Sequence, residues 1–152
     1  MKKLRNTLLS AGILLTLAAC SSGAPATEEE TAAPVAAAAD YVGSWQADRA
    51  TLIIEESGDD EYTATIHWGS SYNEAAEYEY KVYYDEVSAG LSGFENGTKK
   101  YVTYNDDGTV AKEEVIFEDG NAAFNIQEDG TLIWTDFKEA PGEDQMTFEK
   151  IG

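Results

Sequence analysis

The sequence predicts an all-β protein, an antiparallel up-and-down meander of about eight to ten strands that closes into a small barrel. Every tryptophan, tyrosine and phenylalanine lies at or after Tyr41, and aromatic residues favour strands. Stretches of period-two alternation are separated by glycine-containing dipeptides, which are typical of hairpin turns. So many strands in one small sheet leave exposed edges unless the sheet closes on itself. A barrel is therefore the expected architecture.

The alternation is clearest in two segments. In residues 62–68 the apolar side chains fall on one face of the predicted strand, and two threonines with His67 fall on the other. In residues 77–85, three tyrosines and Val82 oppose charged side chains. A strand of this kind has one buried face and one wet face, as an antiparallel sheet allows.

Five dipeptides mark the expected turns: Ser57-Gly58, Asn96-Gly97, Asp107-Gly108, Asp119-Gly120 and Asp129-Gly130. The strands are expected near residues 43–49, 51–56, 62–68, 76–84, 89–95, 99–105, 110–118, 122–127, 131–137 and 145–151.

The N-terminal segment has the layout of a secretory signal peptide, residues 1–19. Basic residues at positions 2, 3 and 5 precede an apolar stretch from residue 7 to residue 19, which is shorter than the roughly 20 apolar residues of a membrane span. The sequence Leu17-Ala18-Ala19-Cys20 resembles the lipobox of bacterial lipoproteins. In that family the cysteine is joined to a diacylglycerol, the chain is cut just before it, and the new N-terminus is usually acylated. The resemblance implies that Cys20 is lipidated and holds the protein on a bacterial membrane. A plain secretory peptide is the alternative.

Residues 20–40 are expected to form a flexible linker that follows the lipidated cysteine. They are rich in alanine, with two prolines and an acidic triplet, and offer one large apolar residue, Val35. Residues 41–152 form the predicted β-barrel domain.

The tripeptide Gly43-Ser44-Trp45 is similar to the Gly-x-Trp of the first strand in lipocalin-type barrels. In that family the tryptophan closes one end of the barrel and packs beneath a basic side chain from near its end. The resemblance implies that Trp45 closes the barrel and that Lys150, the basic residue of the last predicted strand, packs on it. The chain is shorter than a typical lipocalin, and no C-terminal helix is expected. A cup that holds a ligand and a barrel filled by side chains both remain open.

The chain is strongly acidic, with a formal net charge of -19. Nucleic acid is disfavoured as a partner, because its binding proteins need clustered lysine and arginine. The same charge repels anionic headgroups, so the lipid at Cys20 is the expected membrane contact. Solubility accounts for most of the acidity, although cationic solutes or peptides are attracted.

The sequence offers no catalytic constellation, so we expect no catalytic residues, no metal site and no cofactor. The carboxylates fall at turns and on polar strand faces, and nothing identifies a glycosidase pair among them. His67 is the sole histidine, and its nearness in sequence to Ser70 does not make a triad. Acidic turns such as Asp106-Asp107-Gly108 lack the ligand spacing of a calcium loop.

Aromatic residues are the feature left to carry a function. Most are expected in the core, but Tyr72, Tyr83 and Tyr104 fall off the predicted core faces or in loops and are the candidate ligand contacts. We expect a membrane-tethered binding protein for a small amphipathic or apolar ligand, a saccharide or a peptide. The alternative is a cell-envelope interaction module with a solid core. A pocket of at least about 300 Å³ would distinguish the first from the second.

Overall fold

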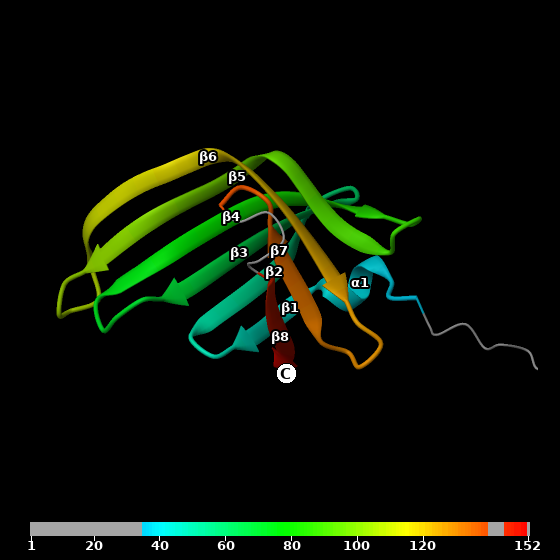
Figure 1. Cartoon of the computed structure of the whole chain (residues 1–152), viewed down its shortest axis with the longest axis horizontal. Coiled ribbons are helices and arrows are strands. Elements are labelled where there is room, and N and C mark those ends of the chain that lie inside the picture. Colours follow the sequence, from blue (N-terminus) through cyan, green and yellow to red (C-terminus); the bar gives the residue numbers. More distant parts are fainter. Residues whose placement is uncertain (1–34, 140–144, 152) are drawn as a thin grey trace, which may run out of the picture. The chain divides into compact units, whose positions relative to one another are not determined.

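Antiparallel strands form a closed barrel in which each strand pairs with the next one along the chain (Figure 1). The computed structural model describes residues 35–139 and 145–151; Cys20, the predicted signal peptide and most of the predicted linker lie outside them. The described elements are α1 (Ala38–Tyr41), β1 (Gly43–Ala47), β2 (Ala50–Gly58), β3 (Glu61–Gly69), β4 (Glu74–Asp85), β5 (Gly90–Tyr104), β6 (Val110–Ile126), β7 (Leu132–Asp136) and β8 (Gln145–Ile151). No helix among these residues has the length and apolarity to cross a membrane.

The ring closes between the first and last strands. β1 pairs with β2 on one side and with β8 on the other, where Trp45 lies opposite Lys150. All eight described strands are antiparallel to their neighbours, so the predicted all-β, up-and-down fold class is confirmed.

Two of the predicted hairpin turns were wrong. Asn96-Gly97 lies inside β5 and Asp119-Gly120 inside β6, so four predicted strands merge into two long ones of 15 and 17 residues. Gly97 pairs with Gly120, and the register shifts on both sides of this pair. A Cβ on Gly97 would lie 2.2 Å from Cε1 of Tyr80, which shows that the glycine makes room for a ring packed against the strand. Glycine inside a strand often marks such a close approach rather than a turn.

Two other predicted turns are confirmed. Asp107-Gly108 and Asp129-Gly130 lie in the hairpin turns after β5 and β6, and their glycines have φ values of 81° and 83°. In each turn the aspartate accepts a hydrogen bond from the N–H of the threonine two residues on. Ser57-Gly58 instead ends β2, and residues 59–60 make the turn.

The barrel interior is built from the inward positions of the alternating strands. In β3 the buried side chains alternate with less buried ones, as expected for residues 62–68. The largest fully buried side chains are Trp45, Tyr41, Tyr80, Phe124, Phe148, Leu52, Ile54, Ile66, Leu91, Leu132 and Val82. Ala36 and Ala38, which precede the predicted start of the domain at Tyr41, also pack against this core.

The two ends of the barrel differ. α1 lies at the end that carries the β2–β3, β4–β5 and β6–β7 turns, which we call the closed end. The opposite end carries the β3–β4 and β5–β6 connections and the residues after β7, and we call it the mouth. The long strands β4, β5 and β6 run side by side toward the left of Figure 1, where the β5–β6 hairpin reaches beyond the shorter strands.

Candidate functional site

The closed end is plugged by Tyr41 and Trp45, both almost completely buried. The Tyr41 hydroxyl donates a hydrogen bond to the carbonyl of Ala89 at 2.7 Å and accepts one from the N–H of Ile126 at 3.2 Å. The indole N–H of Trp45 donates to the carbonyl of Tyr41 at 2.9 Å. These bonds tie α1 to three separate strands or turns, so this end is held as a unit.

Lys150 packs on Trp45 from outside the core. Its Nζ lies 5.0 Å from the centroid of the Trp45 ring and donates a hydrogen bond to the carbonyl of Asp40 at 2.6 Å. An ammonium at this distance from an indole face is attracted by the ring quadrupole. The structure therefore brings together the two residues that the lipocalin resemblance pairs.

A pocket of about 310 Å³ opens at the mouth. Its wall contains four aromatic side chains, a methionine, a lysine and two carboxylates: Trp68, Tyr78, Tyr101, Trp134, Met146, Lys99, Asp136 and Glu139. They come from β3, β4, β5, β7, β8 and the segment after β7. The inward alternation of the strands places these residues together from distant parts of the chain. We call this hollow the mouth pocket.

Lys99 is the central charged group of the mouth pocket. Its side chain is 5% exposed, and its ammonium is ion-paired with the Glu139 carboxylate. The Nζ atom also lies 5.0 Å from the ring centroid of Tyr78 and 4.9 Å from that of Tyr101. Burial opposes the charged form, but the hydrogen bonds to Glu139 and Tyr78 outweigh it and raise the pKa of Lys99 above its usual value. Lys99 is therefore a cation held between two aromatic rings.

The deeper wall of the mouth pocket is aromatic and carries an unpaired indole N–H. Trp134 is 3% exposed and meets Tyr78 edge to face, with the ring centroids 5.0 Å apart. Its indole N–H has no hydrogen-bond partner among the described residues, and the same holds for the hydroxyl of Tyr80, a core residue that does not line the pocket. Burial raises the pKa of Tyr78 to about 12, against the opposing effect of Lys99. The phenol of Tyr78 is thus neutral over the physiological range.

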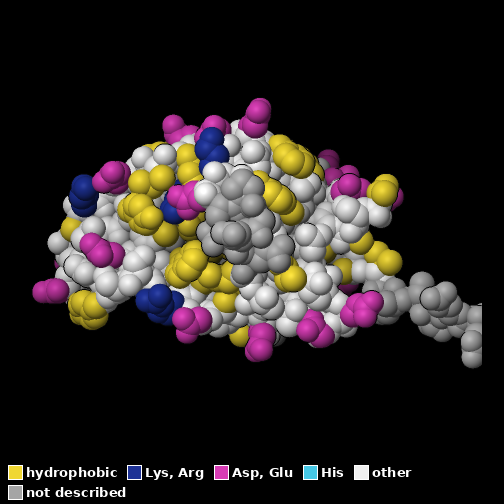
Figure 2. Space-filling view, viewed as in Figure 1, with side chains coloured by type: hydrophobic (Ala, Val, Ile, Leu, Met, Phe, Trp, Pro, Cys, Tyr) yellow, Lys and Arg dark blue, Asp and Glu magenta, His cyan; other side chains and the backbone are white. Residues whose placement is uncertain are grey.

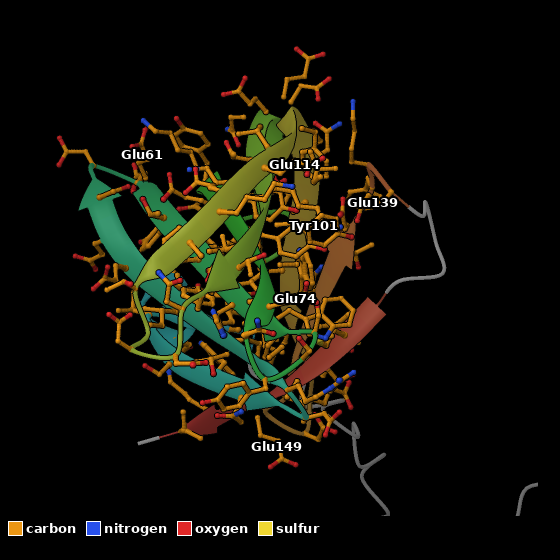
Figure 3. The ribbon with its side chains drawn as sticks, turned by 90° about the vertical axis from the view of Figure 1, so that its left-hand side faces the viewer. Glu61, Glu74, Tyr101, Glu114, Glu139 and Glu149 are labelled. Atoms are coloured by element: carbon orange, nitrogen blue, oxygen red, sulfur yellow. The ribbon has the colours of Figure 1, made fainter. Side chains whose placement is uncertain are left out.

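Carboxylates line the outer rim of the mouth. Glu74 and Glu114 border, with Tyr101, a second hollow of about 310 Å³ that shares Ser70 and Tyr101 with the mouth pocket. Figure 3 shows Tyr101 between Glu74, Glu114 and Glu139, which come from β4, β6 and the segment after β7. Figure 2 shows acidic side chains spread widely over another face of the molecule.

The tyrosines predicted as ligand contacts are not among the residues that line the mouth pocket. Tyr72 is 90% exposed in the β3–β4 connection. The hydroxyl of Tyr83 donates to Glu61 at 2.8 Å, and that of Tyr104 donates to Glu77 at 2.7 Å. The structure does not bring the three together.

His67, for which the sequence predicts no catalytic role, lies beside the Tyr104–Glu77 pair. Its Nδ1 is 2.6 Å from the same Glu77 oxygen that accepts from Tyr104. The described residues contain no group of three or more histidine, cysteine, aspartate or glutamate side chains arranged to hold a metal ion.

Sequence reasoning missed the mouth pocket itself. Alternation predicts inward positions for Trp68 and Tyr78, but it indicates only that they belong to the core. Lys99 and Tyr101 follow the same period of two on β5, but a lysine on an inward face contradicts the usual exposure of that residue type. Their convergence depends on how the ring closes, which no local pattern contains.

Comparison with known proteins gives no match, whether with family models, curated proteins or solved structures.

Proposed function

We propose that this protein is an exported lipoprotein that is anchored to a bacterial membrane through Cys20 and binds a small ligand in the mouth pocket. The observation that carries the proposal is the pocket of about 310 Å³, which four aromatic side chains line and in which two of them, Tyr78 and Tyr101, lie about 5 Å from the buried ammonium of Lys99. This volume lies within the range of about 300 to 1,000 Å³ that is usual for small-molecule sites. The proposed activity is binding without a chemical step.

The ligand classes expected from the sequence are an amphipathic or apolar molecule, a saccharide and a peptide. Indole and phenol rings supply large rigid faces for apolar or sugar surfaces. Lys99, Asp136 and Glu139 supply a donor and acceptors at fixed positions on the same wall. A wall that combines apolar faces with a few polar groups at fixed positions is typical of selective small-molecule sites.

The lipocalin resemblance of Gly43-Ser44-Trp45 supports a division of the barrel into a closed end and an open mouth. The closed end is sealed by Trp45 beneath Lys150, and the middle of the barrel is filled by Tyr80, Phe124 and other large side chains. We infer that the ligand occupies the mouth and does not pass through the barrel.

The anchor is tested by mass spectrometry of the protein from its own host. We expect a mature chain that begins at Cys20 and carries a diacylglycerol, with the protein in the membrane fraction. The variant Cys20→Ala removes the sulfur that forms the thioether and should leave the membrane fraction. An unmodified Cys20 in a protein recovered from the medium would contradict the anchor.

The binding role is tested by native mass spectrometry of the host-purified protein and of two variants. Tyr101 is a half-exposed wall residue, so Tyr101→Ala should lower ligand occupancy without unfolding the barrel. Tyr72→Ala removes an equally large side chain outside the pocket and should keep the ligand. A clean apo mass, together with no thermal shift across lipids, saccharides and peptides, would contradict a binding role.

One observation favours the alternative, an interaction module of the cell envelope. Residues 110–116 of β6 are exposed, including Val110, Val115 and Ile116, and β6 pairs with β7 only from Ala122 onward. An exposed strand edge is a template for pairing with another chain. If the protein is such a module, Ile116→Lys should abolish cross-linking to an envelope protein without changing ligand occupancy of the mouth pocket.

A further inference from the structure

We propose that the mouth pocket selects organic cations: molecules in which a protonated amine or a quaternary ammonium is attached to an apolar body. This inference rests on the binding role proposed above and narrows its ligand to one chemical class. Three features of the described residues support it: the carboxylates at the mouth, the aromatic wall, and the way in which the protein's own lysine is held there.

The carboxylates at the mouth outnumber the ammonium groups. Within the mouth pocket, Lys99 is paired with Glu139, and a second carboxylate of the lining, Asp136, accepts a hydrogen bond from the N–H of Lys138 at 2.7 Å. In the adjoining hollow, Glu74 and Glu114 stand against Lys112, whose Nζ lies 3.0 Å from Glu114. The guanidinium of Arg49 donates a hydrogen bond to the carbonyl of Ser70, which both hollows share, so four carboxylates face three cationic side chains. Opposite charges a few ångströms apart attract more strongly near a protein surface than in bulk water, because the effective dielectric constant is lower there. A positive group that enters the mouth therefore meets a net attraction, and a negative group meets repulsion.

The aromatic wall adds a second attraction for a cation. Trp68, Tyr101 and Trp134 line the pocket, and the face of an indole or phenol carries negative electrostatic potential. A cation over such a face is attracted by the ring quadrupole, and more strongly where the cation is desolvated. The same rings, with Met146, bury an apolar body attached to the charge. Electron-rich walls beside carboxylates thus favour a positive head on an apolar molecule.

Lys99 shows that this environment holds a positive charge away from water. Its side chain is 5% exposed, yet the ammonium is retained by one carboxylate and two ring faces. Burial alone lowers the pKa of a lysine, whereas here the pKa is raised. The interactions of Lys99 with its partners therefore outweigh the cost of desolvating its ammonium. The Glu139 side chain is 36% exposed, so its carboxylate can also contact a ligand cation.

The charge of the whole chain acts in the same direction. From residue 31 onward there are 26 acidic and 7 basic residues, after subtraction of Glu28 to Glu30 from the 29 acidic residues and of Lys2, Lys3 and Arg5 from the 10 basic ones. Such a field raises the local concentration of cations and speeds their association at low ionic strength. It disfavours an anionic ligand before any contact forms.

The test uses three probes that share one apolar body: phenylbutylamine, phenylbutanol and phenylbutyrate, which are positive, neutral and negative at neutral pH. Their affinities are measured by tryptophan fluorescence and calorimetry on the mature chain with Cys20→Ser, which needs no detergent. We expect the amine to bind about tenfold tighter than the alcohol, and the carboxylate to bind more weakly than the alcohol. Alcohol or carboxylate affinity equal to that of the amine would overturn the cation preference.

Two matched double variants distinguish the effect of the mouth carboxylates from the effect of the overall negative charge of the protein. Glu74→Gln with Glu114→Gln removes two carboxylates from the mouth, and we expect amine affinity to fall about threefold to tenfold with no change for the alcohol. Glu55→Gln with Glu149→Gln changes the net charge equally but on exposed positions of β2 and β8. Equal losses in the two double variants would show that the mouth carboxylates have no special role, and would overturn the inference.

The outcomes also distinguish this inference from the proposed function. If the alcohol binds as tightly as the amine and Tyr101→Ala abolishes both, the mouth pocket is a binding site without a preference for cations. If none of the three probes binds at millimolar concentration, the cation site is excluded, and the binding role then depends on the mass of the host-purified protein alone.

Discussion

At the scale of single residues, Lys99 is the side chain on which the mouth depends. A lysine buried on the inward face of a strand is stable only because its charge is paired, and removal of one partner leaves the other uncompensated. The Glu139 side chain is 36% exposed, so water can solvate its carboxylate and offset part of the energy lost when Lys99 is removed. The ion pair is therefore intermediate between a surface pair and a fully buried one.

The first prediction is a double-mutant cycle on this pair. We expect Lys99→Met to lower the free energy of unfolding by about 2 kcal/mol. Combination with Glu139→Gln should cost less than the sum of the single changes, with a coupling energy of about 1 kcal/mol in urea unfolding. The exposed pair Lys112 and Glu114 is the control, where both side chains are more than half exposed and the coupling should approach zero. Additive single variants at Lys99 and Glu139 would contradict the pairing.

The second prediction concerns alkaline pH. The pKa is raised to about 12 for Tyr78, mainly by burial, and to about 12 for Tyr104, mainly by its hydrogen bond to Glu77. In the unfolded chain both return to about 10. Between these values the unfolded state releases protons that the native state retains, so the free energy of unfolding falls as pH rises from about 10 to about 12. Below pH 10 the contribution is fully present.

This dependence is measured by urea unfolding across that range, together with tyrosinate absorbance of the native protein. Tyr104→Phe should make the decline shallower, because it removes one of the tyrosines whose pKa is raised in the native state. A native tyrosinate signal that is complete near pH 10 would contradict the shifted pKa values.

At the scale of elements, the glycine pair in β5 and β6 decides whether these segments are two strands or four. Gly97 lies against the ring of Tyr80, which comes from β4 and is fully buried. A Cβ at Gly97 would lie 2.2 Å from that ring and 3.0 Å from Cα of Gly120. Because Tyr80 is packed on all sides, the ring has little room to retreat.

The third prediction is that Gly97→Ala destabilises the protein by about 2 to 3 kcal/mol through overpacking, as measured by thermal or urea unfolding. Gly69→Ala is the matched control, since its added Cβ would lie 3.6 Å from the nearest atom, an ordinary contact. We expect that change to be within about 0.5 kcal/mol of neutral. Equal effects of the two substitutions would show that Gly97 is not required by the Tyr80 ring.

The same pair explains how far the elements follow from the sequence. Asp107-Gly108 and Asn96-Gly97 are equivalent by local turn chemistry, yet only the first forms a turn. A Cβ on Gly108 would meet no atom within 4 Å, whereas one on Gly97 would meet a tyrosine from another strand. The approximate strand positions, the alternation of buried and exposed side chains and the fold class follow from local sequence patterns. The merging of strands and the convergence of Lys99, Tyr101 and Trp134 at the mouth are set by contacts between segments distant in the sequence.

At the scale of the whole molecule, the barrel divides into a sealed end and an open end. Trp45 and Tyr41, the last residue of α1, fill the first, and the ammonium of Lys150 lies over the Trp45 ring. The pocket lies at the other end and shares no lining residue with that cluster. Closure of the barrel and occupation of the mouth should therefore be separable by mutation.

The fourth prediction tests this separation with Trp45. Its side chain is 1% exposed and donates a hydrogen bond to the Tyr41 carbonyl, so Trp45→Ala should lower the free energy of unfolding by about 3 to 5 kcal/mol. Trp45→Phe keeps most of the apolar volume and loses the N–H, so it should cost about 1 to 2 kcal/mol. Both are measured by urea unfolding. At temperatures where the variants remain folded, phenylbutylamine should bind Trp45→Phe with unchanged affinity. Tyr101→Ala should show the opposite effects: weaker binding of phenylbutylamine and a nearly unchanged free energy of unfolding. An unchanged melting temperature for Trp45→Ala would exclude closure by this residue, and a loss of binding in Trp45→Phe would show that the two ends are coupled.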